Sequence, residues 1–348
     1  MSIPERPTVT VIMPIRNEAN FITRSLGAVL EQDYPDELLE VVISDGMSDD
    51  ATRDVIRALA AKHPGVPVTI VDNPGRIVPT GFNLALARAR GDIIVRVDGH
   101  TIITPSYVRE CVEALQRSGA DNVGGRMDAV AEGAFGRAVA RATSSRFGVG
   151  GARFHYSDRE EWVDTVYMGA WPRSVFARVG LFDEEQVRNQ DDEFNYRLLE
   201  RGGRILLSPR IRSRYYNRAT PRSLWRQYFQ YGFWKVRVMQ KHPGQMSPRH
   251  FVPALFAGGL AVGVLLAPVS HLWAKIAALI GITYLSANVG AAILIGVGEP
   301  IAEALLIPVA FATLHLSYGF GFLVGLVRFA TRWRDRVSHW ARDLQPSA

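Results

Sequence analysis

The chain has 348 residues, a formal net charge of +6 and a single cysteine. This length favours one large domain with an appendage over a single compact core. Cys111 alone excludes an internal disulfide and a thiol-ligated metal site, which agrees with a cytosolic catalytic region. The N-terminus, MSIPERPTVTVIMP, lacks the long apolar stretch of a signal peptide. We therefore expect membrane insertion to depend on C-terminal segments.

Short apolar runs alternate with helical patterns through the first hundred residues. The sequence predicts strands at 9–13, 39–43, 68–71 and 93–97, and helices at 18–32, 51–62 and 81–89. This order predicts an α/β fold with a Rossmann-like, mostly parallel sheet and right-handed crossovers. No GxGxxG motif follows the first strand, so a dinucleotide-binding site is disfavoured.

The C-terminal third is apolar. Residues 251–327 contain three formally charged side chains, Lys275, Glu299 and Glu303. They divide into three stretches, near 251–270, 273–296 and 301–327, each close to the roughly 20 residues that span a bilayer. Buried helices of a soluble domain are the alternative, but they account poorly for three long Gly- and Ala-rich stretches in tandem. We predict C-terminal transmembrane helices after a globular part.

Charge is distributed unevenly around this apolar block. Residues 201–249 hold twelve Lys and Arg and no Asp or Glu, and residues 328–348 hold five Arg against two Asp. The first two hundred residues are acidic, with 22 Lys and Arg against 30 Asp and Glu. Basic flanks predict that both sides of the block lie on the cytoplasmic face. Nucleic acid is the competing partner for the basic segment, but the adjoining apolar block favours an anionic lipid or a lipid diphosphate.

Three crossings cannot leave both flanks on one face, so one stretch is expected to be short, re-entrant or interfacial. Pro253 and Pro268 make the first stretch the best candidate, because proline interrupts helical hydrogen bonds. The predicted organisation is a catalytic domain at 1–220, an amphipathic basic interface segment at 221–250, two to three membrane helices at 251–327 and a basic cytoplasmic tail at 328–348.

Four polar motifs each follow an apolar run: PIRNE at 14–18, SDGMSDDAT at 44–52, VRVDGH at 95–100 and NQDDEFNYR at 189–197. Open α/β sheets bind ligands at the carboxyl ends of their strands. Carboxylates gathered there predict metal-assisted handling of a nucleotide diphosphate.

Asp45 directly follows the second predicted strand. A carboxylate in that position can accept hydrogen bonds from a base or a ribose. The alternative is an N-cap or an Asx turn, which Asp49 and Asp50 fit better because they stand just before a predicted helix. We predict that Asp45 contacts the ligand and that Asp49 and Asp50 cap the helix.

Asp98, Gly99 and His100 end the fourth predicted strand, which we interpret as fully apolar. A carboxylate and an imidazole two residues apart can meet one divalent ion, and Gly99 lets the backbone approach closely. Such an ion would neutralise charge on a leaving diphosphate. Alone, the pattern is more often a turn, but after an apolar strand of this fold it predicts a metal site.

Residues 189–193 form a carboxylate cluster that leads into a helical pattern with Phe194, Leu198 and Leu199 facing inward. The alternative is a helix N-terminus carrying favourable negative charge. Two adjacent aspartates cannot point the same way, so one can cap while the other faces the cleft. A cleft-facing carboxylate among like charges would have a raised pKa, which suits a general base.

These motifs resemble the family 2 glycosyltransferases, which have the GT-A fold, and most closely their membrane-bound subgroup of ExoA-like succinoglycan glucosyltransferases. The similar segments are VIMPIRNEANFI, DGMSDDAT, NPGRIVPTGFNLALARARGDIIVRVDGH, and GAWPRSVFARVGLFDE with NQDDEFNYRLLERGGRI. The resemblance covers about residues 8–240, and the C-terminal block is similar only in kind.

The resemblance implies roles for individual residues. Asp191 falls where the family keeps its catalytic base, Arg76 would approach the diphosphate, and Asp98 would serve a Mg²⁺ or Mn²⁺ ion. The nucleotide pocket would be lined by Pro14, Arg16, Asn17, Glu18 and Asp45.

Two positions depart from the family pattern. His100 stands where most relatives have Asp; ExoA-like members share this His, so we expect it to bind the metal as well. Gln190 replaces the usual Glu before the base, which leaves Asp192 as a rival to Asp191.

The segment QYFQYGFW at 227–234 resembles the QxxRW signature of processive members, with Phe233 where Arg would stand. Gln227, Gln230 and Trp234 would then contact the acceptor. An amphipathic helix at the membrane surface is the equally supported alternative. The missing Arg argues for the addition of a single sugar.

The predicted activity is inverting, metal-dependent transfer of a sugar from a nucleotide-diphosphate sugar, with UDP as the expected nucleotide. The expected acceptor is lipid-linked, such as a polyprenyl diphosphate, in cell-surface polysaccharide or glycolipid synthesis. The protein would be multi-pass in the cell membrane with a cytoplasmic catalytic domain and no nucleic-acid partner.

Two alternatives stay open. A nucleotidyltransferase would need a Gly-rich, Arg- or Lys-bearing loop after the first strand, and PIRNE is not that. An inactive scaffold would be expected to lose Asp98 or the base motif, and both are present.

Overall fold

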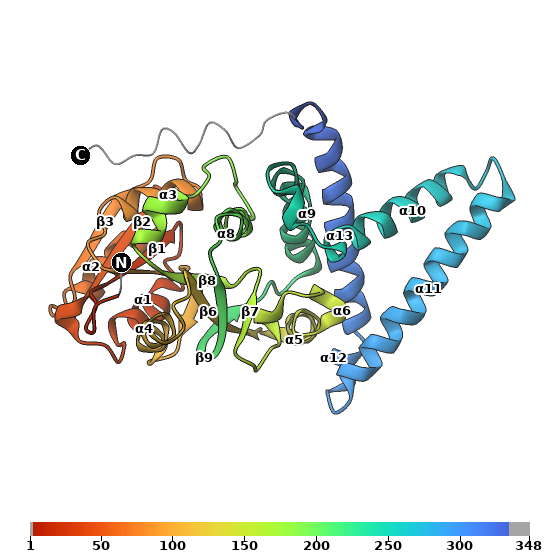
Figure 1. Ribbon diagram of the computed structural model, residues 1–348. Helices are drawn as coiled ribbons and strands as arrows, with labels where there is room; N and C mark the ends of the chain where they lie inside the picture. Colours follow the sequence, from red (N-terminus) through yellow and green to blue (C-terminus); the bar gives the residue numbers. More distant parts are fainter. Residues whose placement is uncertain (1–2, 334–348) are drawn as a thin grey trace. The chain divides into compact units, whose positions relative to one another are not determined.

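The structure, a computed structural model, describes residues 3–333 (Figure 1). These residues divide into two compact units. The first contains residues 3–128 and Tyr156–Tyr215, and the second contains Ala129–His155 and residues 216–333. The domain boundaries expected from the sequence remain a prediction, and residues 334–348 of the expected tail lie outside the described part.

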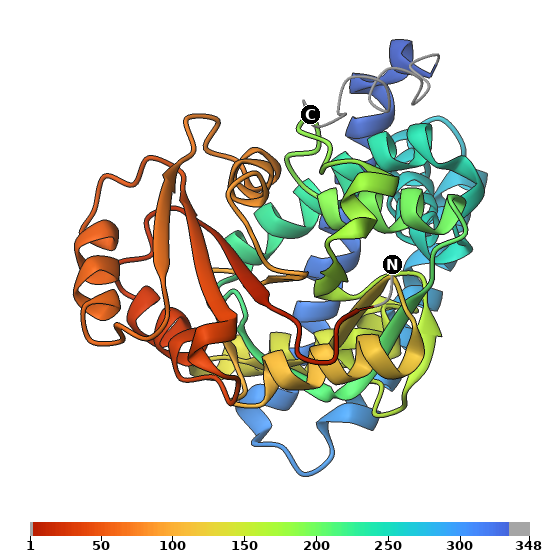
Figure 2. The same cartoon turned by 60° about the vertical axis from the view of Figure 1, so that its left-hand side comes forward.

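A single sheet organises the first unit, and its first half is parallel. Strands β1 (Val9–Ile15), β2 (Leu39–Asp45), β3 (Val68–Asp72) and β4 (Ile93–Arg96) pair in the order β3-β2-β1-β4. They are the four strands predicted from the sequence, and Figure 2 shows β1 to β3 side by side in red and orange. Ile15 pairs with Asp45 and Asp45 with Asp72, so the strands end together at one edge.

The second half of the sheet was not predicted, and four of its strand pairs are antiparallel. The order continues through β8 (Tyr167–Pro172), β6 (Asn122–Val130), β9 (Ile205–Tyr216) and β5 (Thr101–Ile103), and β7 (Glu161–Val163) pairs with β9. The parallel arrangement expected from the first hundred residues therefore holds for β1 to β4 and ends where β4 meets β8.

Helices cover the sheet of the first unit. They are α1 (Ile22–Leu30), α2 (Thr52–Ala60), α3 (Val78–Leu86), α4 (Tyr107–Ser118), α7 (Ser174–Val179) and α8 (Gln190–Glu200). β-branched residues of β1, β2 and β4 form the core with Leu26 of α1 and Leu115 of α4. The predicted helices 18–32, 51–62 and 81–89 correspond to α1, α2 and α3; α1 begins four residues later than predicted because 18–21 belong to the turn after β1.

The second unit is helical. It contains α5 (Gly133–Thr143), α6 (Arg146–Val149), α9 (Pro221–Lys241), α10 (Val252–Leu266), α11 (His271–Gly296), α12 (Ile301–Ala304) and α13 (Ile307–Arg328). Within residues 3–333, three segments are long and apolar enough to span a membrane: Pro248–Leu266, His271–Gly296 and Ile301–Arg328. Pro253 lies in the first turn of α10 and Pro268 follows its end, so neither proline interrupts the helix.

Candidate active site

The turns that follow β1 and β2 are bound to each other. Asn17, which has a left-handed φ of 54°, donates its backbone N–H to Ser48 Oγ at 2.9 Å and accepts from the Asp49 N–H at 3.1 Å. The Glu18 N–H donates to Thr52 Oγ1 at 2.9 Å. An Asn tolerates the left-handed conformation better than most residues. The PIRNE and SDGMSDDAT motifs therefore form one continuous edge of the sheet.

Asp45 is the last residue of β2 and is fully buried. Its carboxylate accepts from the Ser48 N–H at 3.1 Å, from Ser48 Oγ at 2.5 Å and from Arg53 Nε at 2.5 Å. The pair with Arg53 was not predicted. Direct contact between Asp45 and a nucleotide would require Arg53 or Ser48 to move away.

Asp50 bonds at the start of α2, but neither Asp49 nor Asp50 is the N-cap residue that the sequence predicted. Its Oδ1 accepts from the Thr52 N–H at 3.0 Å, and its Oδ2 accepts from the Ala19 N–H at 3.2 Å. The N-cap position itself is Ala51 and makes no side-chain cap bond. Asp50 thus closes an Asx turn into α2 and also fixes the turn after β1.

The turn after β4 joins this edge through a glycine. A Cβ on Gly99 would lie 2.8 Å from Ile15 Cγ2 and 3.1 Å from Glu18 Cγ, so a larger residue would displace the turn after β1. His100 follows directly, and its Nδ1 lies 3.4 Å from Glu18 Oε1. The His100 ring also meets Tyr215 edge-on at 5.5 Å between centroids. Three of the four predicted motifs therefore meet at one edge of the sheet.

Arg96 connects the fourth motif, NQDDEFNYR, to the motif that contains Asp98. This arginine is 3% exposed on β4, donates from Nε to Asp98 Oδ1 at 2.8 Å and pairs through Nη1 with Asp191 Oδ1. The strand before Asp98 is therefore not fully apolar, which corrects our interpretation of it. Arg96 and Asp98 are two residues apart and thus lie on the same side of an extended chain. Two carboxylates 93 positions apart in sequence share one buried cation.

Asp191 and Asp192 point to different partners at the start of α8. Asp191 pairs with Arg96, whereas Asp192 Oδ1 accepts from Thr165 Oγ1 at 3.2 Å. Thr165 Oγ1 in turn accepts from Asn195 Nδ2 at 3.0 Å. The side chain of Asp191 keeps 29% of its surface exposed. Arg96 thus joins Asp191 to the Asp98 motif.

Aromatic side chains fix the position of α8. Phe194 of α8 stacks on Phe182 with 4.7 Å between ring centroids, and Phe82 of α3 packs on Phe182 at 4.5 Å. Trp171 of β8 meets Phe194 edge-on at 5.9 Å. Since these rings are buried, they anchor the first turn of α8, and with it Asp191, against the sheet.

The surroundings of Asp191 raise the pKa of its carboxyl group. Burial raises the pKa of Asp191 to about 6, the charge of Arg96 opposes that rise, and Asp98 and Asp192 add to it. A carboxyl with a pKa in this range is ionised at neutral pH and is still basic enough to accept a proton. Tyr167 stands beside the site: its hydroxyl lies 2.6 Å from Thr101 Oγ1 and 3.5 Å from Asp98 Oδ2.

The remaining predicted donor-side residues lie around the same edge. Pro14 is buried in β1, whereas Arg16 is exposed and covers Gly46, whose Cβ would lie 3.1 Å from Arg16 Cβ. Arg76 is exposed in the turn between β3 and α3 and has a left-handed φ of 57°. Arg16 and Arg76 thus present their guanidinium groups on the exposed surface at the carboxyl ends of the strands.

The sequence profile described as Glycosyl transferase family 2 matches residues 10–180, which contain three of the four motifs. The chain is 32% identical to the succinoglycan biosynthesis protein ExoA of Rhizobium meliloti, over 92% of this chain and 96% of ExoA. The chain belongs to the family 2 glycosyltransferases. Its place in this family confirms the resemblance found from the motifs.

Two further proteins are similar to this glycosyltransferase. A Methanococcus voltae protein, dolichyl N-acetyl-alpha-D-glucosaminyl phosphate 3-beta-D-2,3-diacetamido-2,3-dideoxy-beta-D-glucuronosyltransferase, is 30% identical over 67% of this chain and 74% of its own length. The structure of the mannosyltransferase PcManGT from Pyrobaculum calidifontis, solved with GDP-Man and Mn²⁺, aligns with a TM-score of 0.60 at 23% identity, covering 94% of this chain and 89% of that chain. The GT-A fold expected from the sequence is confirmed.

The predicted metal ligands of the glycosyltransferase are Asp98 and His100. Among residues 3–333, no three His, Cys, Asp or Glu side chains come together as a metal-binding group. Asp98 is nevertheless a carboxylate of the kind that holds Mg²⁺ together with substrate phosphates and waters. Metal binding by Asp98 and His100 stays a prediction.

The predicted acceptor residues lie in α9 of the second unit. Gln227 Nε2 donates to the Tyr231 hydroxyl at 2.9 Å, and Trp234 Nε1 donates to Gln230 Oε1 at 3.2 Å. Each bond joins residues four apart on one helix. An acceptor role for these three residues stays a prediction.

Sequence reasoning missed two arginines of the glycosyltransferase site, Arg96 and Arg53. The signal for Arg96 was available, because an Arg inside an apolar strand is almost never buried without a charged partner. Arg53 carried no such signal: it lies in a helix with a polar face, and its pair with Asp45 depends on how α2 packs beside β2.

Proposed function

We propose that this glycosyltransferase transfers a sugar, with inversion, from a nucleotide-diphosphate sugar to a lipid-linked glycan acceptor. The observation that carries the proposal is the buried Arg96 that joins Asp98 to Asp191. It connects the end of β4, where a nucleotide diphosphate would bind, to the carboxylate at the start of α8. A donor-side carboxylate and a candidate base therefore meet at one edge of the sheet.

In this proposal Asp191 acts as the general base. Its carboxylate takes the proton of an acceptor hydroxyl, and that oxygen bonds to the anomeric carbon while the bond between this carbon and the diphosphate breaks on the opposite face. Arg96 holds the carboxylate in place and keeps its pKa from rising further. The exposed guanidinium of Arg76 is assigned to the leaving diphosphate.

On the donor side, Asp98 and His100 would hold a Mg²⁺ or Mn²⁺ ion that neutralises charge on the diphosphate. Pro14, Arg16, Asn17 and Glu18 would line the nucleotide, and Asp45 would either reach it directly or fix the turn through Ser48. We assign UDP as the expected nucleotide.

The acceptor assignment is supported by the relatives and by the second unit. ExoA is named for succinoglycan biosynthesis, and the Methanococcus voltae enzyme is named for a dolichyl-phosphate-linked sugar. Three apolar segments that could span a membrane follow the catalytic unit. We therefore propose a multi-pass protein of the cell membrane that faces a lipid-linked acceptor from the cytoplasm, with Gln227, Gln230 and Trp234 of α9 on the acceptor side.

A panel of nucleotide sugars tests this function. The full-length protein in membrane vesicles is incubated with each donor and with polyprenyl-diphosphate-linked glycans, and released nucleoside diphosphate is measured. We expect one donor to give acceptor-dependent release of UDP. With pyrophosphate added, formation of a nucleoside triphosphate and a sugar phosphate from the donor would instead indicate a nucleotidyltransferase, and no turnover with any donor would indicate a scaffold.

The charge of Arg96 should affect how the activity depends on pH. Asp191 must be ionised to act as a base, so wild-type activity should fall as the pH drops through about 6, the raised pKa of this carboxyl. Arg96→Met removes the charge that favours the ionised form, so the pKa of Asp191 should rise and the acid limb of kcat/KM should move to higher pH. Arg96→Lys keeps a positive charge and should move the limb back toward the wild-type position.

A matched variant controls for the loss of a paired arginine. Arg90 pairs with Glu40 at 2.9 Å and precedes β4 at its amino end, the edge of the sheet opposite to Asp98. Arg90→Met should leave the acid limb unchanged. If Arg96→Met is folded, as judged by its thermal melt, and also leaves the limb unchanged, then Arg96 does not position the base.

A further inference from the structure

An arginine at the carboxyl edge of the sheet has no role in the reaction proposed above. Arg53 lies in the first turn of α2, and its guanidinium group donates from Nε to Asp45 Oδ2 and from Nη2 to Asp72 Oδ1, each at 2.5 Å. Asp45 and Asp72 are the last residues of β2 and β3 and are paired in the sheet. Arg53 therefore bridges the carboxyl ends of two neighbouring strands, where ligands of open α/β sheets bind.

The Asp45 carboxylate is already occupied by the protein. It is fully buried, and it accepts from Arg53 and from both the N–H and the hydroxyl of Ser48. Its backbone carbonyl also accepts from the Asn73 N–H at 2.8 Å, in the turn after β3. These bonds make Asp45 a residue that positions its neighbours, and Arg53 is the neighbour that it holds most closely.

The guanidinium group of Arg53 is fixed in direction and is still accessible. The Arg53 side chain is 28% exposed and that of Asp72 is 64% exposed. Two of its three nitrogens bond to carboxylates, and no hydrogen-bond partner of Nη1 is found among residues 3–333. Because the guanidinium is a rigid planar fork, fixing two nitrogens also fixes the direction of the third. Arg53 thus presents an oriented donor at the edge of the sheet.

The position of Arg53 suits the base of a nucleotide whose diphosphate lies at Asp98. The strand order β3-β2-β1-β4 places β2 two strands away from β4. Adjacent strands are about 4.8 Å apart, so the ends of β2 and β4 are roughly 10 Å apart. In a nucleoside diphosphate, the ribose and the α-phosphate separate the base from the terminal phosphate. A nucleotide that lies across the strand ends would therefore carry its base over β2 and β3, at Arg53.

We infer that Arg53 selects the nucleotide base by donating from Nη1 to an oxo group, O4 of uracil or O6 of guanine, and that Asp45 and Asp72 hold it in the orientation that this bond needs. Cytosine and adenine carry an amino group at the corresponding ring position, and an amino group is a donor that would face the donors of Arg53. The enzyme should therefore prefer UDP- or GDP-sugars to CDP- or ADP-sugars. The inference rests on the proposed function and deepens it.

An ion pair that only fastens α2 to the sheet is the alternative. Such a pair would support the turns at the strand ends, so its loss would weaken the binding of every nucleotide alike. Base selection instead requires that the loss of Arg53 change the ratio of affinities for two nucleotides that differ in the base. The affinity ratio therefore separates the two roles.

The affinities of the full-length protein for UDP, CDP, GDP and ADP are measured by calorimetry in detergent with Mn²⁺ present. UDP carries an oxo group where CDP carries an amino group, and GDP and ADP differ in the same way. We expect wild-type protein to prefer the oxo member of at least one pair. Arg53→Met should lower the affinity for that nucleotide by about 10- to 100-fold, the effect of one hydrogen bond to a charged group. The affinity for its amino partner should change little.

Two further variants separate the geometry of Arg53 from its charge. Arg53→Lys keeps a positive charge between Asp45 and Asp72 but not the planar fork, so it should preserve the fold and still lose the preference. Asp72→Asn removes one of the two charged acceptors and should weaken the preference less than Arg53→Met does. Arg57→Met is the matched control, because Arg57 lies about one turn later on α2 and pairs with Asp54 on the exposed surface. It should leave all four affinities unchanged.

Equal losses for both members of a pair in Arg53→Met, with a thermal melt close to wild type, would show that Arg53 only supports the turns. An unchanged preference in Arg53→Met, a full preference in Arg53→Lys, or no preference in wild-type protein would also overturn the inference. If Arg53→Met does not fold, the result for Arg53→Lys decides.

Failure of the proposed function gives a different result. A protein whose preference for an oxo base depends on Arg53, but which transfers no sugar in the donor panel, would refute the transfer and leave the base selection standing. A wild-type protein that transfers sugar but shows no dependence on Arg53 would do the reverse. Binding of none of the four nucleotides would refute both.

Discussion

Replacing Asp191 with Asn is expected to lower the turnover of glycosyl transfer by a factor of about 10²–10⁴. Asparagine keeps the size of the side chain and can still accept a hydrogen bond from Arg96, but it cannot take a proton from the acceptor hydroxyl. A loss of this size corresponds to about 3–5 kcal/mol of transition-state stabilisation. Donor affinity should change little, because the predicted donor residues lie at the ends of β1, β2, β3 and β4.

Asp192→Asn is the matched control for this variant. Asp192 is the neighbouring residue in the same first turn of α8, and its Oδ1 accepts from Thr165 Oγ1. We expect it to reduce turnover far less. The measurements are initial rates over a range of acceptor concentrations and nucleotide affinity by calorimetry. If the large loss appears in Asp192→Asn and not in Asp191→Asn, the choice of base within the pair is wrong.

The parts of the fold that were predicted are those with a local signal. Strands β1 to β4 and helices α1 to α3 each have their own hydrophobic period, and a βα alternation implies parallel neighbours. The antiparallel half has no such signal: β4 pairs with β8, whose residues lie some 75 positions later in the chain. Long-range pairing of this kind is decided by packing and not by any single segment.

The candidate site was likewise predicted only in part. The four motifs were visible because each places polar residues after an apolar run. Their connection through Arg96 was not, since it depends on β4 and α8 meeting in space. Likewise, hydropathy ranks α13 with α10 and α11, although 44% of its window is buried in the second unit against 22% and 11% for the other two segments.

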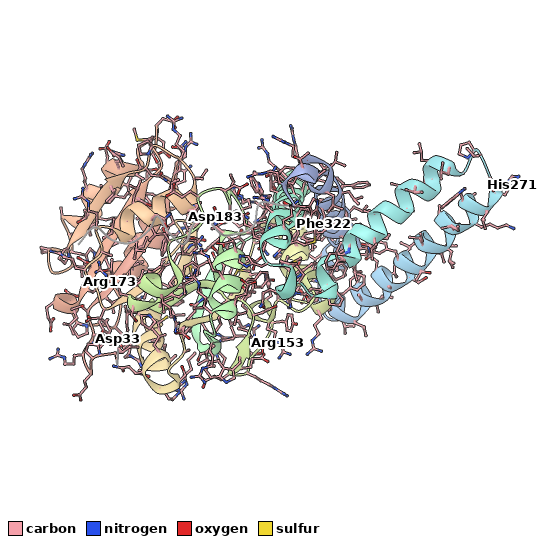
Figure 3. The ribbon with its side chains drawn as sticks, turned by 45° about the horizontal axis from the view of Figure 1, so that its top comes forward. Asp33, Arg153, Arg173, Asp183, His271 and Phe322 are labelled. Carbon is pink, nitrogen blue, oxygen red and sulfur yellow. The ribbon has the colours of Figure 1, made fainter. Side chains whose placement is uncertain are left out.

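Replacing Asp98 with Ala is expected to abolish transfer and to weaken metal binding. Asp98 supplies the carboxylate of the proposed metal pair, and its loss should reduce Mn²⁺ affinity in the presence of UDP by more than about 10-fold, the lower limit measured for even outer-shell changes at metal sites. Mn²⁺ binding is measured by electron paramagnetic resonance and transfer by UDP release. Asp33→Ala is the control, because Asp33 is an exposed surface carboxylate of the same unit, labelled in Figure 3.

Substitutions of His100 separate metal binding from simple disruption of the turn. His100→Ala removes the second proposed ligand and should weaken Mn²⁺ binding, whereas His100→Asp restores an oxygen ligand and should retain it, with a shift in preference toward Mg²⁺ because carboxylates suit that ion. A structural role for His100, through Glu18 and Tyr215, would make both variants equally impaired. Full transfer by wild-type protein after EDTA treatment would show that the reaction needs no divalent ion, and Asp98 would then act only through Arg96. Full transfer by Asp98→Ala would show that Asp98 is needed neither for a metal nor for Arg96.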